Sequence, residues 1–379
     1  MSSCAPFLLR GTLGAAFLVA AAVQAGEGSR HEKKDVQATP DFARGDATSD
    51  PLALLLRAPA IRSELALRQT QVDSLDRLLD GVGEPLWRLR DAQFRDAETS
   101  KAAWQLIDRL ESSLGDILNR EQQTRLRRLL VQARGFHALL SHDVVTGLRL
   151  APDRVRQIAE VLEETRKETQ RLLREASAKG DADRLNQAEK LAAAERKKVL
   201  ALLTDDQKRR WQLLLANHYD FSRLPLRYAR APEVRGVEEW INSTPRTLAE
   251  LRGKVVVLHF FTFGCINCVH NQPAYKDWHE RFSSRGTVVL GIHTPEGESD
   301  RNIGSIRKAL QDQGIVYPVA VDNKKENWTA WANHTWPSVY LIDKEGYVRY
   351  WWYGELNWQG AQGEKLYQKK ILELLAEGT

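Results

Sequence analysis

The sequence predicts a multidomain protein in which an all-α helical bundle is followed by an α/β domain. From about residue 51 to 228, Leu, Ala, Arg, Glu and Gln dominate and β-branched residues are sparse, which favours helices. All nine tyrosines lie at or after Tyr219, and eight of the eleven tryptophans follow residue 230. Runs of Val, Ile and aromatic residues accompany them, as in strands. We therefore place the domain boundary between residues 228 and 229.

The N-terminus has the pattern of a secretory signal. Arg10 precedes an apolar run, Leu13–Val23, that is too short to cross a bilayer comfortably, and small residues lead to Ala25. We expect residues 1–25 to be a signal peptide cleaved after Ala25, and the polar residues 26–50 to be a flexible linker. The expected location is the periplasm, with membrane anchoring if the signal is not cleaved.

Composition narrows the classes of partner. The chain of 379 residues is 42% hydrophobic and 28% charged, as in folded proteins. Its net charge of +5 comes from Lys and Arg dispersed among Asp and Glu rather than gathered in a block. No nucleic-acid partner is expected from such a pattern.

The helical region, 51–228, contains a faint internal repeat. Segments of its first half resemble segments of its second half, 63–79 with 146–162 and 117–130 with 202–215. In the second pair Gln122 matches Gln207. Two duplicated helical hairpins packed as one bundle account for this pattern. The bundle could be a spacer, a module that holds client proteins, or the interface of a homodimer.

The C-terminal region alternates strand and helix patterns. Strands are expected at 255–261, 287–293, 337–343 and 347–353, and helices at about 266–284, 301–313 and 362–376. A leading segment at 229–252 comes first. The last strand contains an aromatic run, YWWY (350–353), which could be a surface for clients, although strand alternation places half of it in the core.

Cys265 and Cys268 directly follow the first of these strands and open a helix. A C-x-x-C disulfide closes a very small loop and stabilises a fold little, so the value of this pair is chemical. At a helix N-terminus the pKa of Cys265 should fall below the usual ~8.5, which makes it the attacking thiol. Cys268, one turn inside, is the resolving thiol. Half of a zinc site is the alternative, but no second C-x-x-C is present, and we expect neither metal nor cofactor.

Around this motif, residues 229–379 resemble the thioredoxin superfamily, specifically its exported TlpA-like and redoxin branch. The likeness is carried by the segments LRGKVVVLHFF, FTFGCINC and GIHTPE, and the last two resemble the thioredoxin-like domains attached to DipZ-type membrane proteins. Pro273 matches the proline that kinks the active-site helix. In the helical region, LNREQQ (118–123) and LTDDQK (203–208) weakly resemble a motif of Spy- and CpxP-like periplasmic proteins, which helix capping alone can also produce.

The resemblance implies further site residues. Pro337 matches the cis-proline that lies against the redox pair, with Trp336 before it. Substrate contacts are implied for Trp336, Phe263, Ile266 and Asn267. In the oxidised state the resemblance implies a Cys265–Cys268 disulfide.

Three positions leave alternatives open. His259 stands where thioredoxin has a buried Asp, and could move a proton as Cys268 reacts or simply pack as a neutral ring. Glu296 could modulate the thiols or be an ordinary loop carboxylate. Thr262 stands three residues before Cys265, as in the T-x-x-C of peroxiredoxins, although the proline of that motif is replaced by Leu258.

The expected activity is therefore thiol–disulfide exchange with protein clients, in the direction of reduction. A membrane electron donor of the DsbD or CcdA type is the expected partner. The alternatives are a periplasmic chaperone with an accessory thioredoxin-like domain, and a thiol peroxidase.

Overall fold

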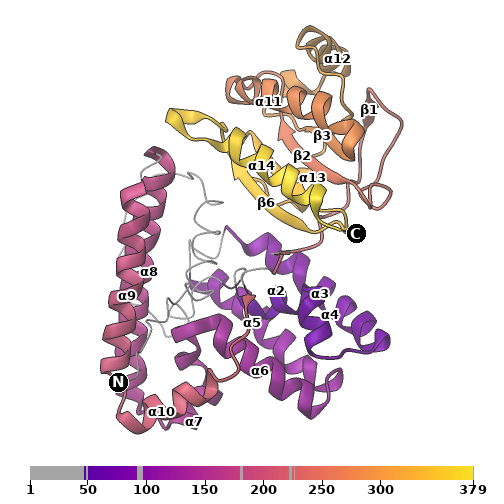
Figure 1. The fold of residues 1–379 in the computed structure, drawn as a ribbon. Helices are drawn as coiled ribbons and strands as arrows, with labels where there is room; N and C mark the ends of the chain where they lie inside the picture. The colour runs from indigo at the N-terminus through magenta and orange to yellow at the C-terminus, as the bar shows by residue number, and fades with distance from the viewer. Residues whose placement is uncertain are drawn as a thin grey trace.

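The structure is a computed structural model that describes residues 47, 50–91, 97–179, 182–221, 224–225 and 227–378. The expected signal peptide and almost all of the expected linker lie outside these residues. In Figure 1 the helical region lies below a sheet-containing domain, and α8 and α9 form a long pair along one side. None of the described helices combines the length and the apolar character that crossing a membrane requires.

The helical region consists of helices joined by short turns. They are α2 (Pro51–Arg57), α3 (Pro59–Glu64), α4 (Gln69–Leu89), α5 (Ala97–Ser113), α6 (Arg120–Arg134), α7 (His142–Leu148), α8 (Pro152–Lys179), α9 (Ala182–Ala201) and α10 (Asp205–Leu214), with 3-10 turns at Leu114–Asp116 and Gly135–Leu140.

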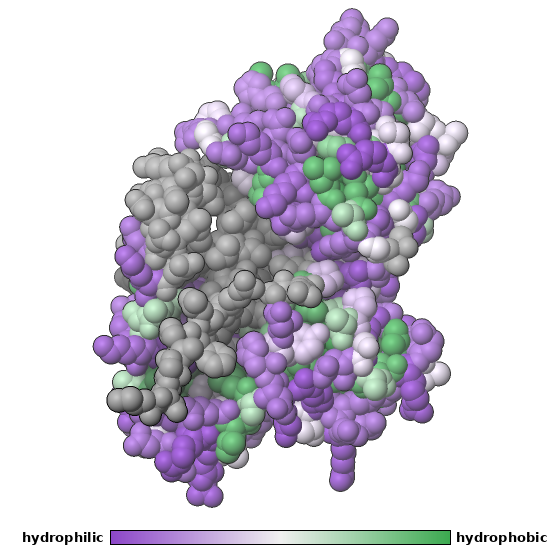
Figure 2. All heavy atoms as spheres, in the orientation of Figure 1, coloured by the Kyte–Doolittle hydropathy of each residue, from purple (hydrophilic) through white to green (hydrophobic). Residues whose placement is uncertain are grey.

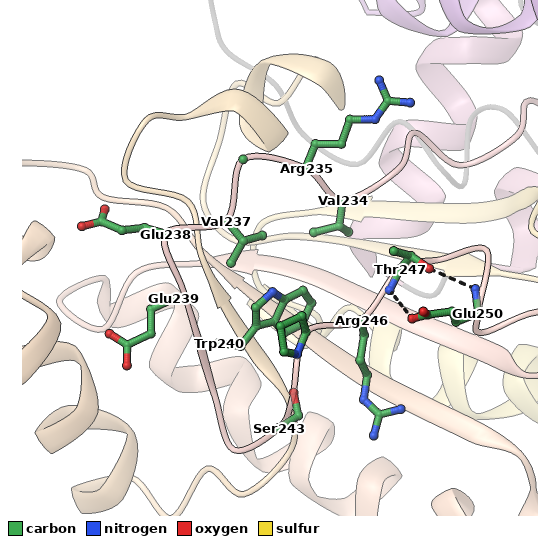
Figure 3. Close-up of a pocket in the computed structure, with 12 residues that line it drawn as sticks. Val234, Arg235, Val237, Glu238, Glu239, Trp240, Ser243, Arg246, Thr247 and Glu250 are labelled. Atoms are coloured by element: carbon green, nitrogen blue, oxygen red, sulfur yellow. Dashed lines mark hydrogen bonds between the residues drawn. The ribbon is translucent and has the colours of Figure 1, made fainter.

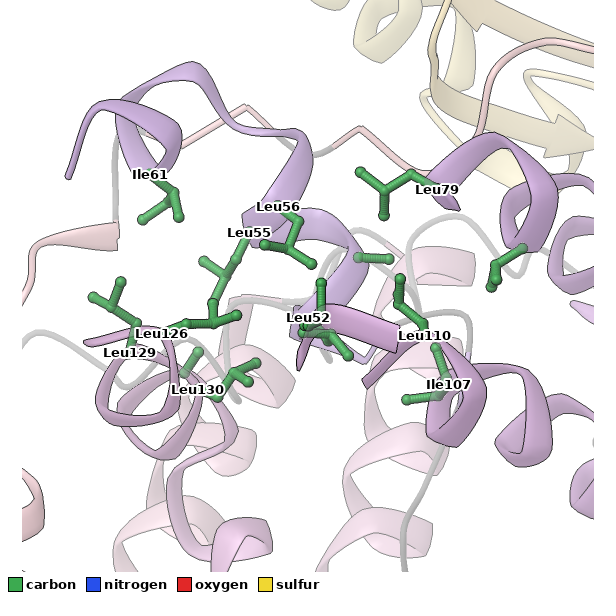
Figure 4. Close-up of a cluster of buried hydrophobic side chains, with 14 of the residues drawn as sticks. Leu52, Leu55, Leu56, Ile61, Leu79, Ile107, Leu110, Leu126, Leu129 and Leu130 are labelled. Atoms are coloured by element: carbon green, nitrogen blue, oxygen red, sulfur yellow. The ribbon is translucent and has the colours of Figure 1, made fainter. Parts of the chain in front are cut away.

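The described helices pack around two hydrophobic cores. The first surrounds α2, whose seven residues are all buried. Figure 4 shows its leucines between those of α6 on one side and Ile107 and Leu110 of α5 on the other. The second core joins α7, α8, α9 and α10. The two cores meet at α6, where Leu130 belongs to the first core and Val131 to the second. The C-cap residue of α6 is Gly135, whose φ is +54°.

The two halves of the predicted repeat have matching capping geometry. Gln122 in α6 and Gln207 in α10 each accept a hydrogen bond from the N-cap backbone of their own helix. Each amide also donates to an earlier turn of its repeat, to the carbonyl of Leu65 at 3.1 Å and of Arg149 at 3.4 Å. Ala66 and Arg149 both have the left-handed conformation. The motif thus caps a helix and fastens it to the preceding turn.

The C-terminal domain is a mixed six-stranded sheet with helices around it. Its strands are β1 (Glu239–Ile241), β2 (Val255–Phe261), β3 (Thr287–His293), β4 (Val319–Val321), β5 (Ser338–Ile342) and β6 (Val348–Tyr353), and its helices are α11 (Ile266–Phe282), α12 (Ile303–Asp312), α13 (Glu326–Ala330) and α14 (Gly363–Ala376). Further 3-10 turns lie at Ser283–Arg285, Glu298–Arg301 and Trp358–Gly360. The strand order is β1-β4-β3-β2-β5-β6.

The four expected strands and three expected helices are all present. The short elements β1, β4 and α13 were missed, because three to five residues are too few to show a period. β2 is central, parallel to β3 and antiparallel to β5. The carboxyl ends of β2 and β3 therefore meet at one edge of the sheet, which is where the cysteine motif begins.

The sheet has two differently covered faces. Val255, Val257 and Phe261 of β2 contribute to a core with α11, α12 and α14, which we call the first-face cluster. The alternate residues of β2 belong to the second-face cluster, which also contains residues of the helical region. Its members are Leu54, Trp87, Tyr228, Ala229, Ala231, Val234, Leu248, Leu251, Val256, Leu258, Phe260, Leu290, Ile292, Ala320, Trp331, Tyr340, Ile342, Val348, Trp351 and Tyr353.

The aromatic run of β6 is divided between the two faces. Trp352 packs in the first-face cluster, and Trp351 and Tyr353 pack in the second-face cluster, each at most 8% exposed. The packing interpretation of this run is therefore correct, and the client-surface interpretation of these three side chains is wrong. Alternation along a strand with both faces covered is the reason.

Candidate active site

The cysteine pair lies where the sequence predicted, between the end of β2 and the start of α11. Cys265 is the N-cap residue of α11, with extended backbone angles, and Ile266 is the first helical residue. Pro273 lies inside this helix, as the resemblance implied. The Cys265 sulfur therefore lies at the N-terminal end of the helix, where the backbone N–H groups of Asn267 and Cys268 act on it.

The two thiols differ in exposure and in acidity. Cys265 is half-buried, Cys268 is 1% exposed, and both are free, so this structure shows the dithiol state. A hydrogen bond from the Cys268 thiol is the main cause that lowers the pKa of Cys265 to about 7, and backbone N–H groups of Cys268 and Asn267 act in the same direction. Burial raises the pKa of Cys268 well above its ordinary value. Near neutral pH a large fraction of Cys265 is therefore thiolate, whereas Cys268 holds its proton.

Trp336 packs against the same cluster as the cysteine pair, and Pro337 follows it in the chain. The Trp336–Pro337 peptide bond is cis, as the resemblance implied. Trp336 packs against the first-face cluster together with Cys265 and Phe263, and Cys268 belongs to that cluster. The indole N–H of Trp336 donates to the carbonyl of Thr294 at 3.2 Å, which fixes the ring. Residues from distant parts of the sequence thus pack against one cluster, to which Cys268 belongs.

The remaining expected substrate residues are on the surface of the site. Ile266 is 62% exposed, Asn267 is exposed, and Phe263 is half-buried. Figure 2 shows one face of the molecule as mostly hydrophilic, with small separate hydrophobic areas. An exposed Ile beside a reactive thiol is therefore an apolar contact that a client could use.

His259 is placed as a packed ring rather than as a proton carrier. It is fully buried, stacks on Tyr275 with ring centroids 4.0 Å apart, and burial lowers its pKa to about 3. Neither ring nitrogen has a hydrogen-bond partner among the described residues. Gly291 lies opposite it on β3, and a Cβ there would lie 3.2 Å from His259 Nε2. This geometry favours the packing interpretation, and the proton role stays a prediction.

Glu296 lies near enough to act on both thiols. Its charge raises the pKa of Cys265 and that of Cys268, although in neither case is it the largest influence. The side chain is exposed, so solvent screens this interaction. The loop that carries it is held by Asp300, which accepts hydrogen bonds from the backbone of Glu296 and Gly297.

Asp300 also reveals a buried network that sequence reasoning missed. The Thr262 hydroxyl donates to Asp300 Oδ2 at 3.0 Å and lies 3.4 Å from His293 Nε2. Thr262 also accepts a hydrogen bond from the backbone N–H of Cys265 through its carbonyl, and His293 stacks on Phe263. The network ties the Glu296 loop to the residues just before Cys265. The Asp had no signal in the sequence, since it lies 38 residues from Thr262.

Neither a metal site nor a second site for thiol chemistry is found among the residues that the structure describes. Within the described residues, no group of three or more His, Cys, Asp or Glu side chains could hold a metal ion. A pocket of about 630 Å³ lies around Trp240, in the segment that leads into β2. Figure 3 shows Arg235 and Glu238 pointing away from each other in its lining, and the dashed lines join Thr247 and Glu250. The lining contains no cysteine or histidine, so it offers no thiol chemistry.

Comparison with known proteins finds relatives of part of this chain. Residues 230–351 match the model of the AhpC/TSA family. The chain is 39% identical over 128 residues to Protein DipZ of Mycobacterium tuberculosis, covering 33% of this chain and 18% of DipZ. It is 26% identical over 146 residues to the thiol-disulfide oxidoreductase YkuV of Bacillus subtilis, covering 38% of this chain and 94% of YkuV. The chain therefore spans less than a fifth of the length of the DipZ relatives.

Solved structures match the same part. The crystal structure of the thioredoxin-like superfamily protein SPOA0173 is 33% identical, with a TM-score of 0.36, and the match covers 40% of this chain and 98% of that one. Strand order, the cysteine pair at the start of α11 and the cis Pro337 agree with the sequence matches. The C-terminal domain of this chain is a thioredoxin-superfamily domain of the TlpA-like redoxin type.

Proposed function

We propose that the protein is an exported thiol–disulfide oxidoreductase that reduces disulfides in protein clients. The observation that carries the proposal is the contrast between a half-buried Cys265 with a pKa of about 7 and a buried, protonated Cys268. Thioredoxin has an attacking thiol of pKa ~7, whereas a strong oxidase of the superfamily has one of ~3.5. The value for Cys265 therefore supports reduction.

The reaction proceeds by two thiol–disulfide exchanges. The Cys265 thiolate attacks one sulfur of the client disulfide and forms a mixed disulfide, while the other client sulfur leaves as a thiolate and takes a proton from solvent. Cys268 then loses its proton to solvent and attacks Cys265, which releases the second client thiolate. The client gains two electrons and the Cys265–Cys268 pair loses two.

A partner must return the enzyme to the dithiol state after each turnover. We propose a membrane electron donor of the DsbD or CcdA type in the periplasm, because the N-terminal pattern indicates export and the segments FTFGCINC and GIHTPE resemble thioredoxin-like domains attached to DipZ-type membrane proteins. The helical region would then hold clients or form a homodimer.

The reduction potential of the Cys265–Cys268 couple tests the direction. Equilibration of the full mature chain with glutathione should give a value near ~−270 mV for a reductase, and one near ~−120 mV would assign an oxidase instead. A Cys268→Ser variant that consumes hydroperoxide through Cys265 would favour the peroxidase alternative.

A further inference from the structure

The C-terminal end of α4, in the helical region, reaches the loop that precedes Pro337. Arg90 is the C-cap residue of this helix and is 2% exposed. Its Nη1 donates to the carbonyl of Trp331 at 2.9 Å, and its Nη2 lies 3.4 Å from the carbonyl of Ala332. Two consecutive peptide groups at the end of α13 are thus held by one side chain from a different region.

The same guanidinium is fixed from the sheet side. Arg90 Nη2 donates to the hydroxyl of Tyr353 at 2.6 Å and to that of Tyr340 at 3.0 Å. The Tyr353 hydroxyl in turn donates to Asp91 at 2.6 Å, and the guanidinium lies 4.1 Å from the ring centroid of Trp87. A buried guanidinium requires such partners, and here they come from α4, β5, β6 and the loop together.

The loop needs an external support. Ala332 has a φ of +51°, a conformation that side chains other than glycine adopt only when neighbours impose it. Its carbonyl is one of the two that Arg90 contacts. Trp336 lies four residues further along the chain and stacks on Trp328 with ring centroids 3.8 Å apart. It directly precedes Pro337, the residue that the resemblance places against the redox pair.

We propose that Arg90 is a positioning residue for the client-binding loop 331–337, so that the helical region completes the binding face of the thioredoxin-like domain. The proposal rests on the proposed function. Arg90 itself does not touch the reacting sulfurs. It holds the backbone at Trp331 and Ala332, and thereby sets where Trp336 and Pro337 meet a client disulfide.

The chain offers a matched control at the same interface. Arg230 of the C-terminal domain pairs with Asp80 of α4 at 3.0 Å. This ion pair also joins α4 to the sheet domain. The backbone of Arg230 forms a β-bridge with that of Tyr347, and its side chain donates to the carbonyl of Glu345, both away from the loop 331–337. Arg230→Met should loosen the interface without moving the loop.

The test uses the full mature chain with Arg90→Met, Arg90→Lys, Tyr353→Phe and Arg230→Met. Hydrogen–deuterium exchange should become faster across 331–336 in Arg90→Met, less so in Tyr353→Phe, and stay at the wild-type rate in Arg230→Met.

The second measurement is kinetic. With insulin as the disulfide client, KM should rise about tenfold in Arg90→Met, as expected when a positioning contact is lost. Alkylation of Cys265 by iodoacetamide should stay within about twofold of wild type. Arg90→Lys keeps the charge but loses the planar fork, so it should recover only part of the effect.

Unchanged exchange across 331–336 in both Arg90→Met and Tyr353→Phe would overturn the proposal. Faster exchange with an unchanged KM would also overturn it, because the loop would then not set client binding. If Arg90→Met fails to fold, the exchange and KM of Tyr353→Phe decide. A wild-type chain that does not reduce insulin would contradict the proposed function instead, while the exchange measurement would still decide whether Arg90 holds the loop.

Discussion

The two faces of the C-terminal sheet differ in which regions of the chain cover them. The first face packs α11 against β2 and supports the cysteine pair, and its contacts all come from the C-terminal domain. The second face is completed by Leu54 and Trp87 of the helical region, with Arg90 among its tyrosines. The residues that support the cysteine pair therefore come from one domain, whereas the residues around the loop before Pro337 come from two.

The largest expected effect is on the first face. Cys265→Ser should abolish client reduction, because it removes the nucleophile, and Cys268→Ser should accumulate a mixed disulfide between Cys265 and the client. Non-reducing gel electrophoresis after mixing with insulin detects the trapped species. Trp87→Phe, on the second face, is the control and should form none. Absence of any adduct with Cys268→Ser would contradict the assigned order of attack.

The next largest expected effect is on the stability contributed by the second-face cluster. Trp87 is 3% exposed and packs edge-on against Trp351, with ring centroids 5.2 Å apart. Trp87→Ala should lower the free energy of unfolding by about 3–5 kcal/mol, since it leaves a cavity between the two regions. Urea unfolding measures this, with Trp87→Phe as the milder control. The pKa of Cys265 should not change, and a shifted pKa would show that the two faces are more closely coupled than we infer.

A smaller effect is expected on the stability of the fold at acidic pH. Burial lowers the pKa of His259 to about 3 and that of His293 to about 4, both below the ordinary 6.5. The unfolded chain therefore binds more protons below pH 6.5, so the stability that is present above this value is lost as the pH falls. From pH 7.5 to 5 each histidine should cost about 2 kcal/mol.

Urea unfolding at the two pH values checks this. His259→Leu should have a shallower loss of stability than wild type. The variant should also keep the wild-type pH dependence of client reduction, because the ring has no partner through which to pass a proton. A shifted pH profile would instead restore the proton role of His259.

The smallest expected effect is at Glu296. Since its charge raises the pKa of Cys265, Glu296→Gln should lower that pKa, by a fraction of a unit because the carboxylate is exposed. The pH dependence of alkylation by iodoacetamide measures the shift, and 0.5 M salt should reduce it. Glu298→Gln, another exposed carboxylate of the same loop, is the control. A rise in the pKa would contradict the placement of Glu296 beside the thiols.

Much of the site could be read from the sequence because its signals are local. The pattern of β2, the start of α11 at Cys265 and the proline before β5 each occupy a few consecutive residues, and all were placed correctly. The contribution of Cys268 to the acidity of Cys265 was missed, because the expected cause was the helix terminus alone. The division of the helical region into two cores was not predicted either, since periodicity shows that a helix has an apolar face but not which partner covers it.

By itself the sequence determined the order of the elements and the place of the cysteine pair at a helix start, and it predicted the helical repeat and which thiol attacks, because these depend on residues close together in the chain. Only the tertiary structure decided that Asp300 holds Thr262 and that Arg90 meets Tyr353, 263 residues away. The physical reason is that a buried polar group must find its partners wherever the fold brings them. No local pattern in the sequence records such a pairing. The contacts of Arg90 nevertheless link the helical region to the loop 331–337.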